Sequence, residues 1–418
     1  MPTVLLLGTC DTKLAELLYT KTQLAQSSAV LLMDIGRDAT SHAELSITQD
    51  DILAPENEPI HGPQISSLDR AEYIAALTPC ATNVVSHLYQ TRRIHGVLGV
   101  GGSCGTALAT ALMRALPVGF PKMMVSTMGS GDVGPYIGET DIAMMYSVVD
   151  IAGRNRVLDR VLSNAAGAIA GMAHVYSNRP LQQPGLNPTD SRVQIGISMF
   201  GVTTPAVTAA RNHLEFTIPN CEVYVFHATG SGGRALERLV REGQLDAVLD
   251  LTTTEIADEV VGGVLSAGAS RLCAASIKDI PCVVSVGACD MVNFGPRDSV
   301  PARFTDAKRV LHQHNPTVTV MRTTKGECRD IARSIARNLL AGADGRARTK
   351  VLLPTGGISM LDAPDQSFWD VEADEILFST LESELQGSGI SIQRDPRHIN
   401  DPGFATAAAD LLRELLEG

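Results

Sequence analysis

The sequence has no long run of Lys or Arg, and its 46 acidic residues outnumber its 34 basic ones, which gives a net charge of −12. Because binding to a nucleic-acid backbone rests on clustered positive charge, we expect no nucleic-acid partner. The chain also lacks an apolar run of the roughly 18–20 residues that a membrane span needs. No basic segment precedes the apolar residues near its N-terminus, so no secretory signal is indicated. We therefore expect a cytoplasmic protein with no membrane partner.

Several catalytic and metal-binding motifs are missing as well. None of the eight cysteines forms a C-x-x-C pair, which argues against a zinc ribbon and a thioredoxin-like site and favours reduced, mostly buried thiols. Neither H-x-x-x-H nor H-E-x-x-H occurs, so no zinc site is indicated. The absence of G-x-x-x-x-G-K-[ST] excludes a Walker A loop.

What the sequence does contain is a pair of glycine-rich loops, at 101–106 and 126–132, each after a short apolar run. Such loops leave backbone N–H groups unpaired, and with a helix N-terminus behind them they suit an anion such as phosphate. The alternative is two tight turns that need glycine only for packing. Two successive loops with hydroxyl groups favour the phosphate site. Its candidate residues are Gly101, Gly102, Ser103, Gly105, Thr106, Ser126, Thr127, Met128, Gly129, Ser130 and Gly131.

A third glycine turn follows the first apolar run, Val4–Leu7, which we expect to be a buried parallel strand. Strand, glycine turn and helix form the first half of a Rossmann-like unit, although the G-x-G-x-x-G fingerprint is absent. The polar residues of this turn either cap the helix or contact a ligand and its Mg²⁺, with a lysine as the counter-charge to phosphate. The candidate residues are Gly8, Thr9, Asp11, Thr12 and Lys13.

Four aspartates have candidate roles of their own. Asp34 closes the second apolar run, at the position where a Rossmann-like fold often holds a ribose hydroxyl. Asp11, Asp132 and Asp141 lie among glycines and hydroxyl residues, where each is a candidate ligand of hydrated Mg²⁺. The alternative for these three is that they cap turns.

The chain is too long for one ordinary core, so two domains are expected. A helix predicted at 154–176 carries small residues along one side, a candidate interdomain or dimer surface, and three prolines then mark a linker. We place the first domain at 1–178, the linker at 179–192 and the second domain at 193–418. The expected fold is α/β, with two Rossmann-like subdomains, mostly parallel sheets and a cleft between the domains.

The second half repeats the pattern of apolar runs that end in loops of Thr, Ser, Gly and acidic residues. Such loops line the ligand crevice of open α/β sheets. GGSCGTAL at 101–108 is similar to GSGGRAL at 230–236, which hints at two similar units, although too few residues match to identify a duplication. The candidate acid–base groups of this half are His227, Glu255 and Asp290.

Longer motifs make the comparison specific. They include GTCDTK at 8–13, GVGGSCGTALATALMRALP at 99–117, VSTMGSGDVGPYIGETDI at 125–142, VVDIAGRNR at 148–156, FGVTTPAVTAAR at 200–211 and FHATGSGGRALE at 226–237. Together they resemble the largely uncharacterised family of the ATP-binding domain of the tomato mosaic virus-resistance protein. The resemblance covers essentially the whole chain.

The resemblance implies two Rossmann-like subdomains, binding of ATP with Mg²⁺, and a homodimer. It also implies that any activity needing the barrel domain of the plant protein would come from a separate barrel-domain partner. Two functions are therefore open. One is a Mg²⁺-dependent enzyme that hydrolyses ATP or transfers its phosphoryl group to a small molecule in the interdomain cleft. The alternative is a non-catalytic, nucleotide-responsive module.

Overall fold

The computed structural model describes residues 1–53, 67–178, 192–342 and 346–418. The chain divides into two units, Met1–Gln182 and Gln183–Gly418. The predicted linker at 179–192 lies outside the described residues except for Arg192. Among the helices that the structure describes, none combines the length and the apolar character that spanning a membrane requires.

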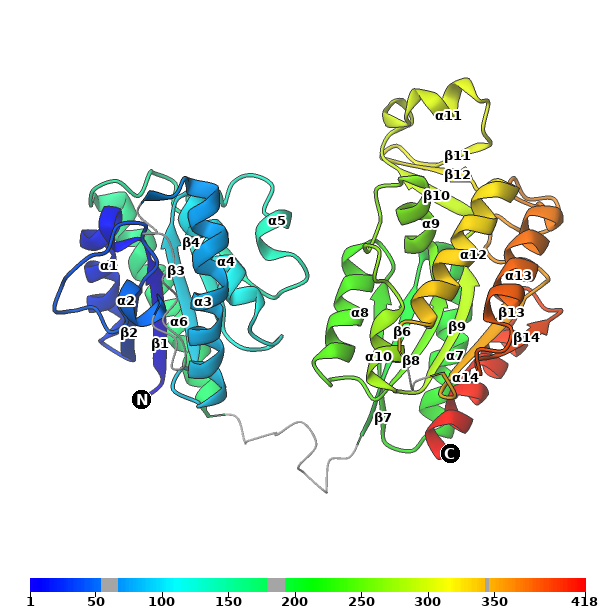
Figure 1. Ribbon diagram of the computed structural model, residues 1–418, viewed down its shortest axis with the longest axis horizontal. Coiled ribbons are helices and arrows are strands. Elements are labelled where there is room, and N and C mark those ends of the chain that lie inside the picture. Colours follow the sequence, from blue (N-terminus) through cyan, green and yellow to red (C-terminus); the bar gives the residue numbers. More distant parts are fainter. Residues whose placement is uncertain (54–66, 179–191, 343–345) are drawn as a thin grey trace. The chain divides into compact units, whose positions relative to one another are not determined.

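The first unit is a five-stranded, wholly parallel sheet in the order β2-β1-β3-β4-β5 (Figure 1). Its elements are β1 (Thr3–Gly8), α1 (Cys10–Leu24), β2 (Ala29–Asp34), α2 (Gln49–Leu53), α3 (Arg70–Gln90), β3 (Gly96–Gly101), α4 (Ser103–Arg114), β4 (Lys122–Ser126), α5 (Gly134–Ile137), β5 (Ala143–Tyr146) and α6 (Arg156–Ser177).

Helices cover both faces of this sheet, which explains why its central strands are apolar throughout. Alternate residues of β1 point to opposite faces: Leu5 and Leu7 pack with α3 and α4, whereas Val4 and Leu6 pack with α1 and α6. The small residues of α6 divide between two sides: Ala165, Ala166, Ala170 and Ala173 belong to this second core, whereas Gly167, Ala168 and Gly171 are exposed.

The second unit has a six-stranded parallel sheet in the order β14-β13-β9-β8-β6-β7 and a small antiparallel sheet, β10-β12-β11. Its elements are β6 (Val193–Met199), α7 (Thr204–Thr217), β7 (Cys221–His227), α8 (Ser231–Arg241), β8 (Ala247–Thr252), α9 (Thr254–Val261), α10 (Cys273–Lys278), β9 (Cys282–Gly287), β10 (Met291–Phe294), α11 (Ala302–Asp306), β11 (Leu311–Asn315), β12 (Val318–Arg322), α12 (Lys325–Leu339), β13 (Thr349–Pro354), α13 (Val371–Leu385), β14 (Ser391–Asp395) and α14 (Pro402–Glu417).

The large sheet is again sandwiched. One face packs against α8, α9, α10, α12 and α13, and the other against α7 and α14. The small antiparallel sheet lies at the end of the large one where its parallel strands terminate, as Figure 1 shows for β10, β11 and β12. It shares a separate apolar core with the loop after β6 and with Phe368.

The predicted α/β fold with two mostly parallel sheets is confirmed. The two units also share one strand order. When the strands of each large sheet are numbered along the chain, both sheets have the order second-first-third-fourth-fifth, and the second unit adds a sixth strand after the fifth. The similar segments 101–108 and 230–236 therefore belong to two units of the same topology. They are not equivalent loops, because segment 101–108 follows β3, the third strand of its unit, whereas segment 230–236 follows β7, the second strand of its unit. The cleft expected between the domains stays a prediction.

Candidate functional site

In each unit the strand order reverses beside the first strand: β1 lies between β2 and β3, and β6 lies between β7 and β8. Open α/β sheets bind ligands at such switch points, in the crevice beyond the carboxyl ends of the strands, because the connections on either side leave toward opposite faces. The two candidate sites are therefore the loops after β1 and β3 and the loops around β6 and β8.

The loop between β3 and α4 leaves backbone donors open. Gly102 is the N-cap residue of α4, and no side chain caps the helix. In the part of the chain that the structure describes, nothing accepts from the N–H groups of residues 102–105, whereas the next one, that of Thr106, bonds the Gly102 carbonyl at 2.8 Å. These donors lie at the positive end of a 12-residue helix, an arrangement suited to an anion.

Space is available on the same side of the loop. A Cβ at Gly102 would meet only Thr127 Oγ1, at 3.7 Å, and a Cβ at Gly105 would meet only Thr9 Cγ2, at 3.8 Å. The loops after β1, β3 and β4 therefore lie side by side. Gly101 is different, because a Cβ there would stand 3.0 Å from Gly105 Cα. That glycine is needed for the close approach of β3 to α4.

Two of the predicted ligand residues hold the loops together instead. Thr106 and Ser126 are fully buried, and their hydroxyl groups share a hydrogen bond of 2.6 Å. Ser126 Oγ also accepts the N–H of Met128 at 2.9 Å. This pair joins the start of α4 to the end of β4, so both side chains position the site and neither faces a ligand.

The loop after β4 satisfies most of its own donors. Backbone hydrogen bonds run from the N–H groups of Thr127, Gly129 and Gly131 to the carbonyls of Gly101, Ser126 and Met128. Within 127–131, Ser130 alone has an N–H for which the described residues offer no acceptor. A Cβ at Gly129 would stand 3.0 Å from the Cα of Tyr146. Here the packing interpretation of the glycines holds better than the phosphate interpretation.

The loop after β1 adds hydroxyl groups. Gly8 has α1 packed so closely against it that a Cβ would overlap Leu17. Thr9 does not cap α1, and its hydroxyl lies 2.9 Å from that of Thr12. Asp11 is exposed, and its Oδ2 accepts the N–H groups of residues 37 and 38 at 3.2 Å each. The end of β1 and the first turn of α1 thus contribute two hydroxyls and one carboxylate oxygen, Asp11 Oδ1, which accepts the Thr12 hydroxyl at 3.4 Å and no backbone N–H.

Asp34 and Lys13 turn out to be tied to the backbone. Asp34 is fully buried and accepts the N–H groups of Cys10 at 3.0 Å, Gly36 at 2.8 Å and Thr40 at 3.4 Å. A carboxylate in this position shapes the β1 and β2 loops and has no face open to a ribose. Lys13 donates from Nζ to the carbonyl of Ile151 at 2.7 Å, which directs its charge toward the loop before α6.

The three candidate Mg²⁺ ligands separate into two groups. Asp11 and Asp132 follow the ends of β1 and β4 and are exposed, and Asp132 uses Oδ1 to accept the N–H of Gly134. Asp141 precedes β5 and pairs with the buried ammonium of Lys122, the first residue of β4, at 2.6 Å. It therefore lies at the amino edge of the parallel sheet, opposite the glycine loops, and cannot share a metal with them.

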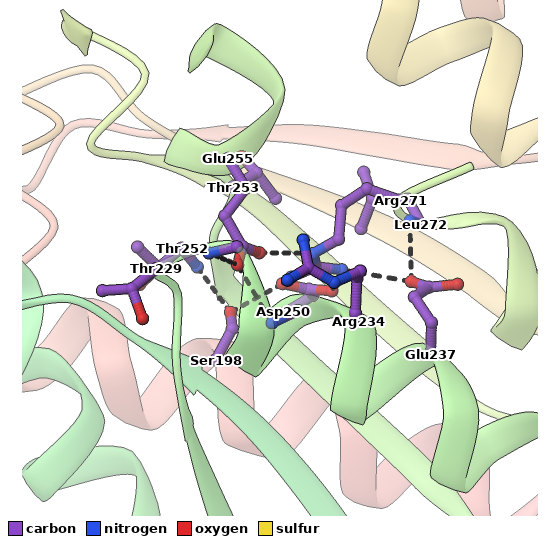
Figure 2. A network of polar contacts seen from close by, with 12 residues as sticks. Ser198, Thr229, Arg234, Glu237, Asp250, Thr252, Thr253, Glu255, Arg271 and Leu272 are labelled. Atoms are coloured by element: carbon purple, nitrogen blue, oxygen red, sulfur yellow. Dashed lines mark hydrogen bonds and ion pairs between the residues drawn. The ribbon is translucent and has the colours of Figure 1, made fainter. Parts of the chain in front are cut away.

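In the second unit a carboxylate of the protein occupies two of the comparable donors, whereas the N–H groups of Ser231 and Gly232 have no acceptor among the described residues. Glu255, at the start of α9, accepts the N–H groups of Gly230 at 2.7 Å and Gly233 at 2.9 Å through Oε1, so its carboxylate caps α8 (Figure 2). A Cβ at Gly233 would overlap Glu255, and one at Gly232 would overlap the carbonyl of His227. The glycines of this loop are required for packing, and its anion position holds a carboxylate of the protein itself.

Glu255 belongs to a buried network centred on Arg271, whose side chain has no exposed surface. Arg271 donates to Asp250 at 2.5 and 2.7 Å, to Glu255 at 2.8 Å and to Glu237 at 3.2 Å. Figure 2 shows these groups converging from different elements, with Ser198 bonded to Asp250. Burial alone would lower the pKa of Arg271, but the carboxylates of Asp250 and Glu255 outweigh burial and raise it.

Asp290 lies in a second buried cluster. Its Oδ2 accepts the hydroxyl of Ser359 at 2.7 Å, while its Oδ1, like Oδ1 of Asp362, has no partner among the described residues. Burial, together with the neighbouring carboxylate of Asp362, raises the pKa of Asp290 to about 7. Burial likewise raises the pKa of Asp374 to about 8, against the pull of Arg322, which it contacts at 2.6 Å.

The three candidate acid–base residues are not brought together. His227 ends the edge strand β7, is exposed, and stacks edge-on against Phe200 with ring centres 5.6 Å apart. Glu255 is fully buried with both oxygens bonded, and Asp290 is buried in the other cluster. Glu255 in particular has a structural role that leaves no oxygen for a substrate.

The sequence did not point to Arg271, Asp250 and Glu237, which form a buried network of ion pairs. One signal was present: Asp250 interrupts the apolar run of β8, a strand buried along its whole length. A charged residue at such a position is rarely buried without a partner. The partner itself, 21 residues further along the chain, had no local signature.

Comparison with known proteins covers both units. The N-terminal domain of an uncharacterised protein family, UPF0261, matches residues 2–178, and the C-terminal domain of the same family matches residues 192–416. A UPF0261 protein of Clostridium tetani is 42% identical over 99% of both chains. One from Rhizobium meliloti is 43% identical, again over 99% of both. The ToMV resistance protein Tm-1(GCR237) of Solanum lycopersicum is 38% identical over 99% of this chain and 56% of its own length.

Proposed function

The chain belongs to the uncharacterised protein family UPF0261, and from the geometry of its first unit we propose that it is a nucleotide-binding protein that holds the phosphates of ATP at the loops after β1 and β3. The observation that carries the proposal is the row of open N–H donors at residues 102–105, at the start of α4. They lie at the switch point of the sheet, and the hydroxyl groups of Thr9 and Thr12 lie on the adjacent loop.

The residues present fit a polyphosphate with Mg²⁺. Backbone donors and hydroxyls suit phosphate oxygens, and a Cβ added at Gly102 or Gly105 would project into otherwise open space. The described residues contain no group of three His, Cys, Asp or Glu side chains that could hold a metal ion. Mg²⁺ would therefore be held by phosphate oxygens and water, with Asp11 or Asp132 supplying a carboxylate. The bound metal would neutralise phosphate charge.

Within nucleotide binding, two functions remain. An enzyme that uses ATP on a small molecule would need acid–base groups, and His227 is the exposed candidate in the second unit. A non-catalytic, nucleotide-responsive homodimer is favoured by one specific observation: Glu255 is buried, and both of its carboxylate oxygens are bonded within the protein.

The test is calorimetric titration of the full chain with ATP, ADP and AMP, with and without Mg²⁺. We expect ATP to bind and Gly102→Val to abolish binding, because its branched side chain would cover the open donors. Gly167→Val, at an exposed glycine of α6 with nothing within 4 Å, is the matched control and should bind like the parent protein. Unchanged ATP affinity in a folded Gly102→Val variant would overturn the site.

Phosphate release then separates the two functions. Steady release from ATP that is lost in His227→Ala, with ATP affinity unchanged, identifies the enzyme. Binding of ATP without release supports the nucleotide-responsive module. Weaker ATP binding in His227→Ala would place the nucleotide in the second unit and contradict the proposed site.

A further inference from the structure

A pocket of about 560 Å³ opens on the first unit between α1 and the first turns of α6. The pocket is shallow and largely open to solvent. Six of its lining residues matter for its chemistry, and none of them belongs to the loops after β1, β3 or β4: Tyr19, Arg156, Asp159, Arg160, Ser163 and Asn164.

The one acidic side chain of the lining is already paired. Arg154 donates to both oxygens of Asp159, at 3.0 Å each, from the loop that precedes α6. The same guanidinium lies 4.1 Å from the centre of the Tyr19 ring, which fixes its position. Asp159 is thus neutralised by a residue outside the lining and does not offset the positive charge within it.

Arg156 and Arg160 are the remaining charges of the pocket. Both are exposed, and neither has a hydrogen-bond or ion-pair partner in the described part of the chain. They are four residues apart, on one face of α6, and occupy its first two turns. Like charges at this spacing repel, and cations are unfavourable at a helix N-terminus. An anion bound between the two side chains would relieve both effects.

The lining is held in place before any ligand arrives. The hydroxyl of Tyr19 shares a hydrogen bond of 2.8 Å with Ser163 Oγ, which joins α1 to α6 across the pocket. Asn155 caps α6 by accepting the N–H groups of residues 157 and 158. The two arginines therefore extend from a fixed helix end, and the amide of Asn164 lies one turn beyond Arg160 for polar contacts.

We infer that this pocket is an anion site, separate from the nucleotide loops, that binds the phosphate group of a small phosphorylated molecule. Guanidinium groups match the geometry of phosphate oxygens, and two of them can share one dianion. The acidic net charge of the chain disfavours a nucleic acid as the source of that phosphate.

The experiment uses the full chain carrying Gly102→Val, so that phosphate binding at the glycine loops is removed. Calorimetry with phenyl phosphate and with inorganic phosphate, each at constant ionic strength set by chloride, should give saturable binding of one equivalent. Tighter binding of phenyl phosphate identifies an organic phosphate as the ligand, and equal affinities identify free phosphate. Adding Arg156→Gln and Arg160→Gln should weaken binding at least tenfold.

The matched control is Arg70→Gln, which also removes an exposed arginine from the first position of a helix, here α3. It should leave phosphate affinity within twofold. Circular dichroism checks that each variant is folded, which the exposure of all three arginines favours. No saturable binding at millimolar phosphate, or binding that survives loss of both pocket arginines, would overturn the proposal.

Discussion

Gly233 donates its N–H to Glu255 at 2.9 Å, and a Cβ at Gly233 would overlap the same carboxylate. In the first unit the corresponding kind of loop has no such carboxylate: the donors after Gly102 are open, and no side chain caps α4. Two glycine-rich loops of similar sequence therefore have different chemistry. In one loop a carboxylate of the protein binds two of the donors, and in the other all the donors are available to a ligand.

The glycines of the first unit should respond differently to substitution. Gly102→Val should change the free energy of unfolding by less than about 0.5 kcal/mol, because its backbone is extended and a Cβ meets nothing closer than 3.7 Å. Gly129→Val should cost about 1–3 kcal/mol, since its side chain would press on the backbone of Tyr146. Urea unfolding measures both, and equal losses of stability would contradict the distinction.

The sequence was sufficient to place these loops but not to distinguish them. Short apolar runs followed by glycine turns predicted the strands β1, β3 and β4, because a parallel strand that is buried on both faces is apolar along its whole length. What separates the two loops is the carboxylate of Glu255, which is 22 residues from Gly233 and reaches it only through the fold. The ion pair of Asp141 with Lys122 at the opposite edge of the sheet likewise depends on the tertiary structure and has no signal in the local sequence.

Arg271→Met should destabilise the second unit by about 3–5 kcal/mol, because removing one partner leaves buried carboxylates without their counter-charge. Asp250 and Glu255 would keep their backbone and hydroxyl donors but lose the guanidinium between them. The control is Arg241→Met at an exposed arginine of α8, which should be within about 0.5 kcal/mol of the parent protein. Denaturation by urea, followed by circular dichroism, gives both values.

Nucleotide affinity offers an independent readout on Arg271. If ATP binds only at the loops of the first unit, a folded Arg271→Met protein below its melting temperature should retain its affinity for ATP. If Arg271→Met loses affinity for ATP as well as stability, the second unit contributes to the nucleotide site, and a site formed by the first unit alone is contradicted.

The stability of the second unit should fall as the pH rises from about 4 to about 7. The pKa of Asp290 is about 7 in the folded chain, against 3.8 ordinarily, because burial and Asp362 disfavour its charge. Between these values the folded chain keeps a proton that the unfolded chain releases, and each unit of pH costs about 1.4 kcal/mol per proton. The raised pKa of Asp374, about 8, extends the decline.

Asp290→Asn removes this titration, so its free energy of unfolding should depend less steeply on pH between 5 and 7. Asn cannot ionise, and it fits the buried site beside Ser359 without charge. Asp298→Asn, at an exposed aspartate in the segment after β10, should leave the slope unchanged. Urea unfolding at pH 5, 6, 7 and 8 measures the slopes. A slope in Asp290→Asn equal to that of the parent would mean that Asp290 is ionised throughout this range, with Asp362 or Asp374 holding the proton instead.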